Sequence, residues 1–430
     1  MSSQVDRNET KPRGVQRATI TPVGQDSVAS LEIGGITRNS NTNSNLSIVN
    51  SIGFTFTWPA PIPAVGSTDD SSAPDKDMNA NYNRALNLLK NNPPEQRLDI
   101  QLPHAKYLEL KEAFFKLYPE SLELRYPSLS YNSFTGTVTV VTCPANVHES
   151  AAGVISSAIY EYATQYLSTC SQELEVHIAW FGSTTTSNFR GPFEGSRKQP
   201  DGGVRYLGRG GKVTVVVEVG FSEDYTSLCR SKDVWIDGHG VNVFILVCLT
   251  ERPRFKNPTT EYGDIGDVDD ATALMWDSIN ETLDLNLSNN RNALFLYRGH
   301  KWTGKLKDAF IEIWRAGTSV SSKYLLIQNG HTCDDLPTTL GIKISDLFPD
   351  NVWRAANIAD KVIPFNGTRY MKSLLGGMAG TAVDRFETFI RNGRGGRRRR
   401  GEEGGGRGGR GGRASGSASG RGRGRGREDE

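Results

Sequence analysis

A near-continuous run of β-branched residues, interrupted by one carboxylate, constrains the fold of this chain most strongly. Residues 213–220 read Val-Thr-Val-Val-Val-Glu-Val-Gly. A run of this kind predicts a central strand that is covered on both faces. Because an unpaired carboxylate is costly to bury, Glu218 needs a cation, a metal ion or hydrogen-bond donors within the fold.

The residues just before this run supply a candidate partner. Residues 208–211 read Gly-Arg-Gly-Gly, a turn signal between two strand-like segments. A turn centred on these four residues places Asp201 directly opposite Glu218, with the two Cβ atoms roughly 4.5–5.5 Å apart. Two carboxylates this close repel each other unless one is protonated or a cation lies between them, and Mg²⁺ accepts such a site. Asp201 could instead cap a turn with Gly202 and Gly203.

A helix is expected over residues 224–237, and it offers a third member. The inward stripe of this helix consists of Tyr225, Leu228, Cys229, Trp235 and Ile236. Lys232 occupies the position on the stripe where the spacing calls for an apolar residue. Its ammonium group either meets the two carboxylates or extends outward to water. Glu218 could equally form a structural ion pair with Lys232 or Arg197.

The rest of the pattern predicts an α/β protein. Amphipathic helices are expected over 103–120 and 148–167, and strands over 122–126, 135–144, 175–182, 200–207, 212–221 and 241–249. Further strands are expected over 293–299, 309–317 and 323–330. We therefore expect a disordered segment over 1–80, a core over 95–256, a β-rich C-terminal extension packed on it over 257–385, and a disordered tail over 391–430.

The charge of the chain is unevenly distributed. The last forty residues hold 13 Arg and five acidic residues, which leaves 37 basic and 43 acidic residues in the first 390. Arginine pairs with phosphates and stacks on bases, and glycine keeps a chain mobile, so this tail is expected to bind nucleic acid, with RNA or single-stranded DNA favoured. The arginines expected to make these contacts are Arg397, Arg398, Arg399, Arg400, Arg407, Arg410 and Arg413.

Other features bear on location. The N-terminal residues lack the apolar stretch of a signal peptide, and no apolar run reaches the length of a membrane span. The five cysteines contain no CxxC pair. An intracellular protein without a membrane partner is expected, and the four consecutive arginines at 397–400 favour the nucleus.

Several motifs resemble those of a known superfamily. The stretches are Cys143-Pro-Ala-Asn-Val-His-Glu149, Lys198-Gln-Pro-Asp201 and Val217-Glu-Val-Gly-Phe-Ser222. They resemble the PD-(D/E)XK, or restriction-endonuclease-like, superfamily, and most closely a set of uncharacterised fungal proteins. Stretches similar to the following region of those proteins are Gly299-His-Lys-Trp302, Glu312-Ile-Trp-Arg315 and Ser345-Asp-Leu-Phe-Pro349.

The resemblance implies a restriction-endonuclease-like mixed sheet flanked by helices, and Mg²⁺-dependent cleavage of nucleic-acid phosphodiester bonds. Asp201 and Glu218 would then bind the metal ion. The lysine that the superfamily carries two residues after the glutamate is Gly220 here. In some bacterial members that lysine has moved to the next helix, where Lys232 stands. Lys198 is a second candidate, although strand alternation points it away from Asp201 unless Pro200 breaks the pattern.

Two other functions remain open at this point. The chain could be a non-catalytic nucleic-acid-binding or ribonucleoprotein scaffold built on a degenerate nuclease fold, which Gly220 favours. It could also be a protein-interaction module whose tail is incidental.

Overall fold

The computed structural model describes residues 74–404 except 94, 120–125, 143–144, 183, 259–266, 290–291 and 293, with side chains described from residue 77 to residue 392. The chain divides into the units Met1–Thr68 and Asp69–Glu430, and every described residue belongs to the second. The expected disordered segment lies outside the described residues up to 73. Helix begins at Pro74, before the expected start of order near 95.

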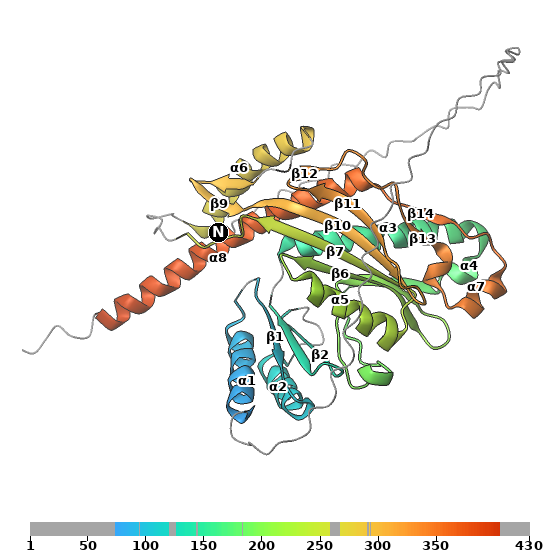
Figure 1. Ribbon diagram of the computed structural model, residues 1–430. Coiled ribbons are helices and arrows are strands. Elements are labelled where there is room, and N and C mark those ends of the chain that lie inside the picture. The colour runs from blue at the N-terminus through green and yellow to red at the C-terminus, as the bar shows by residue number, and fades with distance from the viewer. Residues whose placement is uncertain are drawn as a thin grey trace, which may run out of the picture. The chain divides into compact units, whose positions relative to one another are not determined.

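A seven-stranded mixed sheet forms the centre of the structure (Figure 1). Its strands, in spatial order, are β12 (His331–Thr332), β11 (Ser322–Gln328), β10 (Lys305–Arg315), β7 (Val243–Arg252), β6 (Lys212–Phe221), β5 (Gly202–Tyr206) and β4 (Ile178–Phe181). Strands β6 and β7 are parallel, and all other neighbours are antiparallel. The β-branched run in β6 is buried from Thr214 to Gly220, as expected for a central strand.

Helices cover both faces of this sheet (Figure 1). Helices α3 (Asn146–Cys170) and α8 (Gly367–Gly404) pack on the face that carries Val215, Val217 and Val219. The opposite face is covered by α5 (Tyr225–Asp233), which continues into a π-helical segment, η2 (Val234–His239). The structure is thus an α/β fold with a mixed sheet flanked by helices.

A second, smaller sheet precedes the central one in sequence. It contains β1 (Arg97–Gln101), β3 (Thr137–Val141) and β2 (Ser128–Asn132) in that order, and it packs with α1 (Pro74–Asn91) and α2 (His104–Leu117) around a separate hydrophobic cluster. The expected core over 95–256 therefore holds two sheets rather than one. The strand expected over 122–126 lies almost wholly in undescribed residues.

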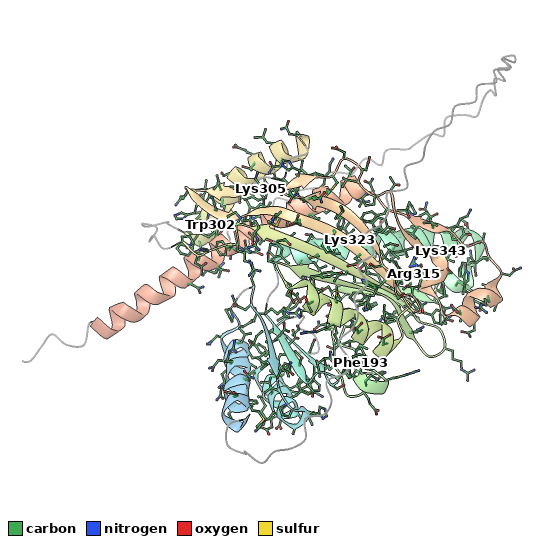
Figure 2. The ribbon with its side chains drawn as sticks, in the orientation of Figure 1. Phe193, Trp302, Lys305, Arg315, Lys323 and Lys343 are labelled. Atoms are coloured by element: carbon green, nitrogen blue, oxygen red, sulfur yellow. The ribbon has the colours of Figure 1, made fainter. Side chains whose placement is uncertain are left out.

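The region expected as a β-rich extension, 257–385, differs from that expectation. Strands β10 to β12 belong to the central sheet, and Lys305 and Arg315 stand at the two ends of β10 (Figure 2). The region also contains two long helices, α8 and α6 (Val268–Ser288). The remaining elements are α4 (Gln172–Glu175), η1 (Gly191–Phe193), β8 (Phe295–Tyr297), β9 (His300–Thr303), β13 (Thr339–Lys343), η3 (Ile344–Leu347), α7 (Asp350–Ala356) and β14 (Val362–Pro364).

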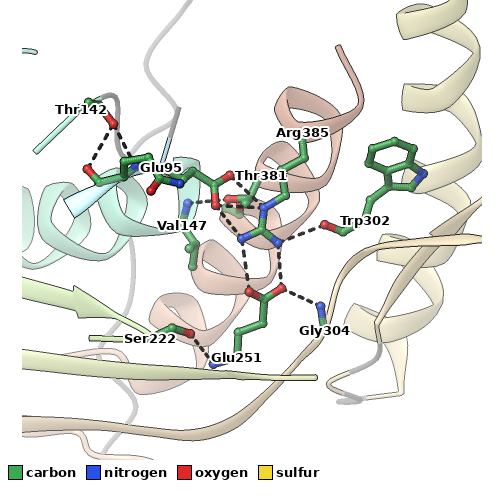
Figure 3. Close-up of polar contacts among 11 residues, drawn as sticks. Glu95, Thr142, Val147, Ser222, Glu251, Trp302, Gly304, Thr381 and Arg385 are labelled. Carbon is green, nitrogen blue, oxygen red and sulfur yellow. Dashed lines mark hydrogen bonds and ion pairs between the residues drawn. The ribbon is translucent and has the colours of Figure 1, made fainter. Parts of the chain in front are cut away.

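A buried arginine on α8 joins distant parts of the chain, and we call Arg385 with its partners Glu95 and Glu251 the Arg385 cluster (Figure 3). The guanidinium donates to both oxygens of Glu95 over 2.6–3.0 Å and to both oxygens of Glu251 over 2.8 and 3.2 Å. It also donates to the carbonyl of Trp302, while the amide of Gly304 donates to Glu251. Every strong donor is therefore paired, as a buried cation requires.

The tail expected over 391–430 lies largely outside the described residues. Helix α8 extends to Gly404 and contains Arg397 to Arg400, but no side chain is described beyond residue 392, and the other three arginines lie outside the described residues. Within the described residues, no helix combines the length and the apolarity that crossing a membrane requires.

Candidate active site

The turn between β5 and β6 pairs the strands as the sequence predicts. Gly202 lies opposite Val217 and Gly203 opposite Val216, the pairing that places Asp201 one step further along, across from Glu218. The amide of Asp201 donates to the carbonyl of Val217 over 3.1 Å. An irregularity near Arg205 shifts the pairing only nearer the turn. The predicted register is confirmed at the end of the strands that carries both carboxylates.

Asp201 lies at the entry to β5, and its side chain is nearly buried. Its Oδ2 atom accepts a hydrogen bond from the amide of Val219 over 2.7 Å and lies 3.3 Å from Nε2 of His148 on α3. Burial acts to raise the pKa of Asp201, but the charge of His148, the two hydrogen bonds and the charge of Lys198 together lower this pKa below its usual value. Asp201 is therefore held as a carboxylate.

Glu218 lies on the face of β6 that α5 and η2 cover, and its side chain is 9% exposed. Trp235 donates from Nε1 to its Oε1 over 2.6 Å, and Nζ of Lys198 lies 3.2 and 3.3 Å from its two oxygens. Burial raises the pKa of Glu218, Lys198 lowers it, and the negative charge of Asp201 raises it again; the net shift is upward. The two carboxyl groups thus differ in their affinity for a proton.

Lys198 approaches Glu218 because its segment does not follow the alternation of β5. Lys198 exchanges two backbone hydrogen bonds with Thr186, over 2.8 and 2.9 Å, so it pairs with a loop and not with β6. Pro200, which has no amide proton, separates this pairing from β5. The sequence allowed Lys198 to reach the carboxylates only if Pro200 broke the strand alternation, and the structure shows this break. We call Asp201, Glu218 and Lys198 the Glu218 cluster.

Lys232 lies elsewhere. Its Nζ atom is 2.7 Å from Asp233 and 4.5 Å from the ring centre of Trp314 on β10. The buried stripe of the helix contains Leu228 and Ser231, so Lys232 is one position away from the residue that meets the sheet. The structure brings Asp201 and Glu218 together with Lys198, and not with Lys232.

Gly220, two residues after Glu218, faces the same helix. A Cβ atom built there would lie 2.3 Å from Cδ1 of Leu228, which is fully buried. Tight packing, and not open space, surrounds the position where the superfamily carries its lysine. A lysine at 220 would therefore require the side chain of Leu228, or α5 with it, to move.

Two further groups near this cluster were not predicted from the sequence. The stripe predicts Trp235 only as an apolar residue, but its indole N–H donates to Glu218. Glu223 follows β6, and its Oε1 atom lies 2.8 Å from Nη1 of Arg97 on β1. Burial raises the pKa of Glu223 to about 7, although Arg97 opposes the shift. Buried tryptophans and glutamates usually find partners, and this rule is the signal that the sequence offered.

Helix α8 fixes the N-terminus of α3, which carries His148. The hydroxyl of Thr381 accepts from the amide of Val147 over 3.1 Å, and Asp384 accepts from the side chain of Asn146 over 2.7 Å. Glu149, in the first turn of this helix, accepts from the hydroxyl of Tyr126 over 3.3 Å. The position of His148 beside Asp201 thus depends on α8.

The donor set bears on metal binding. Among the described residues, no three His, Cys, Asp or Glu side chains come close enough together to hold one ion. Asp201 and Glu218 supply two hard oxygen donors, and Mg²⁺ is commonly held by one or two carboxylates with water and substrate phosphate completing its shell. The pair therefore fits Mg²⁺ only as part of a site that substrate completes.

Comparison with known proteins adds no relative to this picture: no protein-family model matches the chain, and no curated protein matches it.

Proposed function

We propose that the chain carries a Mg²⁺-dependent site of restriction-endonuclease type that cleaves nucleic-acid phosphodiester bonds. The observation that carries this proposal is the Glu218 cluster, in which two carboxylates from neighbouring strands and one ammonium group converge. The order α3, β4, β5, β6, α5, β7 supports it, because this is the order that the sequence resemblance implies.

Each side chain would have a distinct role. Asp201, whose pKa is lowered, and Glu218 would hold the metal ion, which when bound activates water and neutralises phosphate charge. Lys198 would leave Glu218 when the metal ion binds and donate its ammonium protons to a phosphate oxygen. His148 would keep Asp201 oriented.

The arginine-glycine tail would hold RNA or single-stranded DNA near this site. A tether raises the local concentration of substrate without contributing a contact at the site. Because the tail binds phosphates through charge, its affinity should fall steeply as salt concentration rises. A nuclear, nucleic-acid-rich setting is the one this proposal favours.

The same cluster supports a second candidate, a nucleic-acid-binding scaffold on a degenerate nuclease fold. Both oxygens of Glu218 already have protein donors, and Gly220 is closed off by Leu228. In this case Lys198 stays on Glu218, and the tail alone binds nucleic acid.

A comparison of two lysine variants tests the proposal. We expect Lys198→Met to abolish Mg²⁺- or Mn²⁺-dependent cleavage of single-stranded DNA and RNA, and Lys232→Met to retain it, because only Lys198 contacts Glu218. We also expect Mn²⁺ to raise the melting temperature of wild type but not of Asp201→Asn.

The outcomes separate the candidates. If Lys232→Met lost cleavage and Lys198→Met kept it, Lys232 would be the catalytic lysine. If the wild type neither cleaved nucleic acid nor gained stability from metal ions, the non-catalytic scaffold would be the remaining candidate. Removal of residues 393–430, which leaves the ion pair of Arg391 with Glu387 in place, should then remove nucleic-acid binding.

A further inference from the structure

A pocket of about 350 Å³ lies between α2 and the segment 185–197. Its volume is at the lower end of the range of small-molecule sites, about 300–1,000 Å³, and larger than one phosphate group requires. Helix α2 contributes His104, Tyr107 and Lys111, and the segment contributes Arg197 and several hydroxyls. Of the described residues that line it, none is acidic.

Among the described residues, no acidic side chain neutralises the cations of this pocket. Within the part of the chain that the structure describes, neither Arg197 nor Lys111 forms an ion pair, and Nε of Arg197 is buried without a hydrogen-bond partner. The guanidinium of Arg197 lies over the ring of Phe115, 5.2 Å from its centre. A buried donor of this kind indicates a missing acceptor, because such groups are almost always paired.

Tyr107 carries a second buried donor without an acceptor. The residue is 2% exposed, and its hydroxyl has no hydrogen-bond partner. Burial raises the pKa of Tyr107 to about 12, against the opposing charge of Arg197, so the hydroxyl keeps its proton and can donate. Two residues that line this pocket therefore each carry a buried donor without a partner.

The walls of the pocket also offer a flat surface. The rings of Tyr107 and Tyr131 stack with centres 4.3 Å apart and planes 8° from parallel. The ring of His104 lies beside both, 5.5 Å from Tyr131 and 6.1 Å from Tyr107, and His104 is exposed. An aromatic base can extend such a stack with little regard to its identity.

The pocket is next to the Glu218 cluster along the chain. Consecutive residues of an extended segment point in opposite directions, and Arg197 lines the pocket while Lys198 contacts Glu218. The same segment contains Phe193, whose ring lies 5.4 Å from that of Phe134 (Figure 2). This contact, together with the backbone pairing of Arg197 with Tyr131, fixes the segment on the smaller sheet.

We propose that this pocket binds the phosphate group of a nucleotide, with Arg197, Lys111 and the Tyr107 hydroxyl on the phosphate and the base against His104. The inference deepens the proposed function, since a nucleotide held here would belong to the substrate strand. It stands, however, on donors that do not belong to the Glu218 cluster. The phosphate would complete the hydrogen bonds that the protein leaves open, and arginine suits this role because its planar donors match phosphate oxygens.

Calorimetry on the full-length protein in EDTA tests the pocket without metal-dependent cleavage. The probes are thymidine 5′-monophosphate, thymidine and inorganic phosphate. We expect the monophosphate to bind at least about tenfold more tightly than either other probe, and Arg197→Met to weaken it at least about tenfold, as the loss of a charged hydrogen bond implies. Lys116→Met, on the same helix but outside the pocket, should bind like wild type.

Tyr107→Phe guards against a folding defect. The hydroxyl has no hydrogen-bond partner among the described residues, so its removal should leave the melting temperature unchanged or higher. The same change should lower the affinity for thymidine 5′-monophosphate. Equal binding by wild type, Arg197→Met and Tyr107→Phe would overturn the proposal. Inorganic phosphate binding as tightly as the monophosphate would overturn the nucleotide assignment.

A final variant separates this inference from the proposed function. Glu218→Gln should lose cleavage and still bind the monophosphate. Loss of monophosphate binding in Glu218→Gln would contradict the pocket, whereas a wild type that binds the monophosphate but never cleaves would contradict only the proposed nuclease.

Discussion

The Arg385 cluster and the Glu218 cluster both bury carboxylates, yet they satisfy them in different ways. Glu251 receives two donors from a planar guanidinium and one from a backbone amide, so both of its oxygens are hydrogen-bonded. Glu218 receives one indole N–H and a lysine, while burial and the negative charge of Asp201 raise its pKa. The guanidinium of Arg385 presents its donors in a rigid planar fork. The ammonium of Lys198 lies on a flexible side chain that can move away from Glu218.

This difference teaches how the two clusters are used. The Arg385 cluster joins three distant segments permanently, and its geometry leaves no donor for a ligand. The Glu218 cluster keeps a conflict between two carboxylates that a cation would relieve. Unresolved charge of this kind is typical of functional sites, although structural networks also perturb pKa values.

The largest expected effect breaks the permanent cluster. Arg385→Met should lower the free energy of unfolding by about 3–5 kcal/mol, because it leaves Glu251 buried without its cation. Urea denaturation at neutral pH measures this loss. Arg391→Met, which removes an exposed ion pair on the same helix, should show no measurable change. Equal losses in the two variants would mean that burial does not distinguish these arginines.

A pH series sharpens the comparison at Glu223, beside the Glu218 cluster. Its pKa rises from 4.5 to about 7, so between these pH values the folded protein holds a proton that the unfolded chain has released. Stability from this group is therefore present at low pH and is lost as pH rises through this window, by on the order of 3 kcal/mol.

Glu223→Gln should remove this dependence. The free energy of unfolding of the variant should fall less between pH 4.5 and 7 than that of wild type. Glu161→Gln, an exposed position on α3, should follow the wild-type curve. Parallel curves for wild type and Glu223→Gln would contradict the assigned shift.

The smallest expected effect concerns the closed wall at Gly220. Gly220→Ala should cost about 1–3 kcal/mol, since the added Cβ would lie 2.3 Å from Leu228. The double variant Gly220→Ala/Leu228→Ala should lose less than the sum of the two single variants. Gly153→Ala on α3, where a Cβ meets nothing within 4 Å, should not destabilise the protein. An unchanged free energy of unfolding in Gly220→Ala would show that Leu228 or α5 moves at little cost.

The sequence predicted the strand pairing at the site because its signals are local. A glycine-rich turn and a β-branched run lie next to each other in the chain, so the position of Asp201 across from Glu218 follows from counting. The lysine could not be assigned in this way. Ser231 and Lys232 are both polar, and the pattern alone does not tell which one faces the sheet.

The sequence made Lys198 only a second candidate and did not predict α8, because both depend on packing between distant segments. Lys198 is directed by backbone pairing with Thr186, which no periodicity reveals. Helix α8 contains glycines that weaken a helix in isolation, but Gly377 and Gly380 are positions where a Cβ would lie 2.7 Å from Val147 and 2.9 Å from Asn146. These glycines let α8 approach α3 closely.

The separation of Glu95 and Arg385 by 290 residues has a consequence for how the protein matures during synthesis. A ribosome releases both acidic partners of this arginine long before α8 emerges. The nascent chain therefore carries two carboxylates that await their shared cation, and α3 awaits the residues that fix its first turn. The fold is therefore incomplete until α8 has been synthesised.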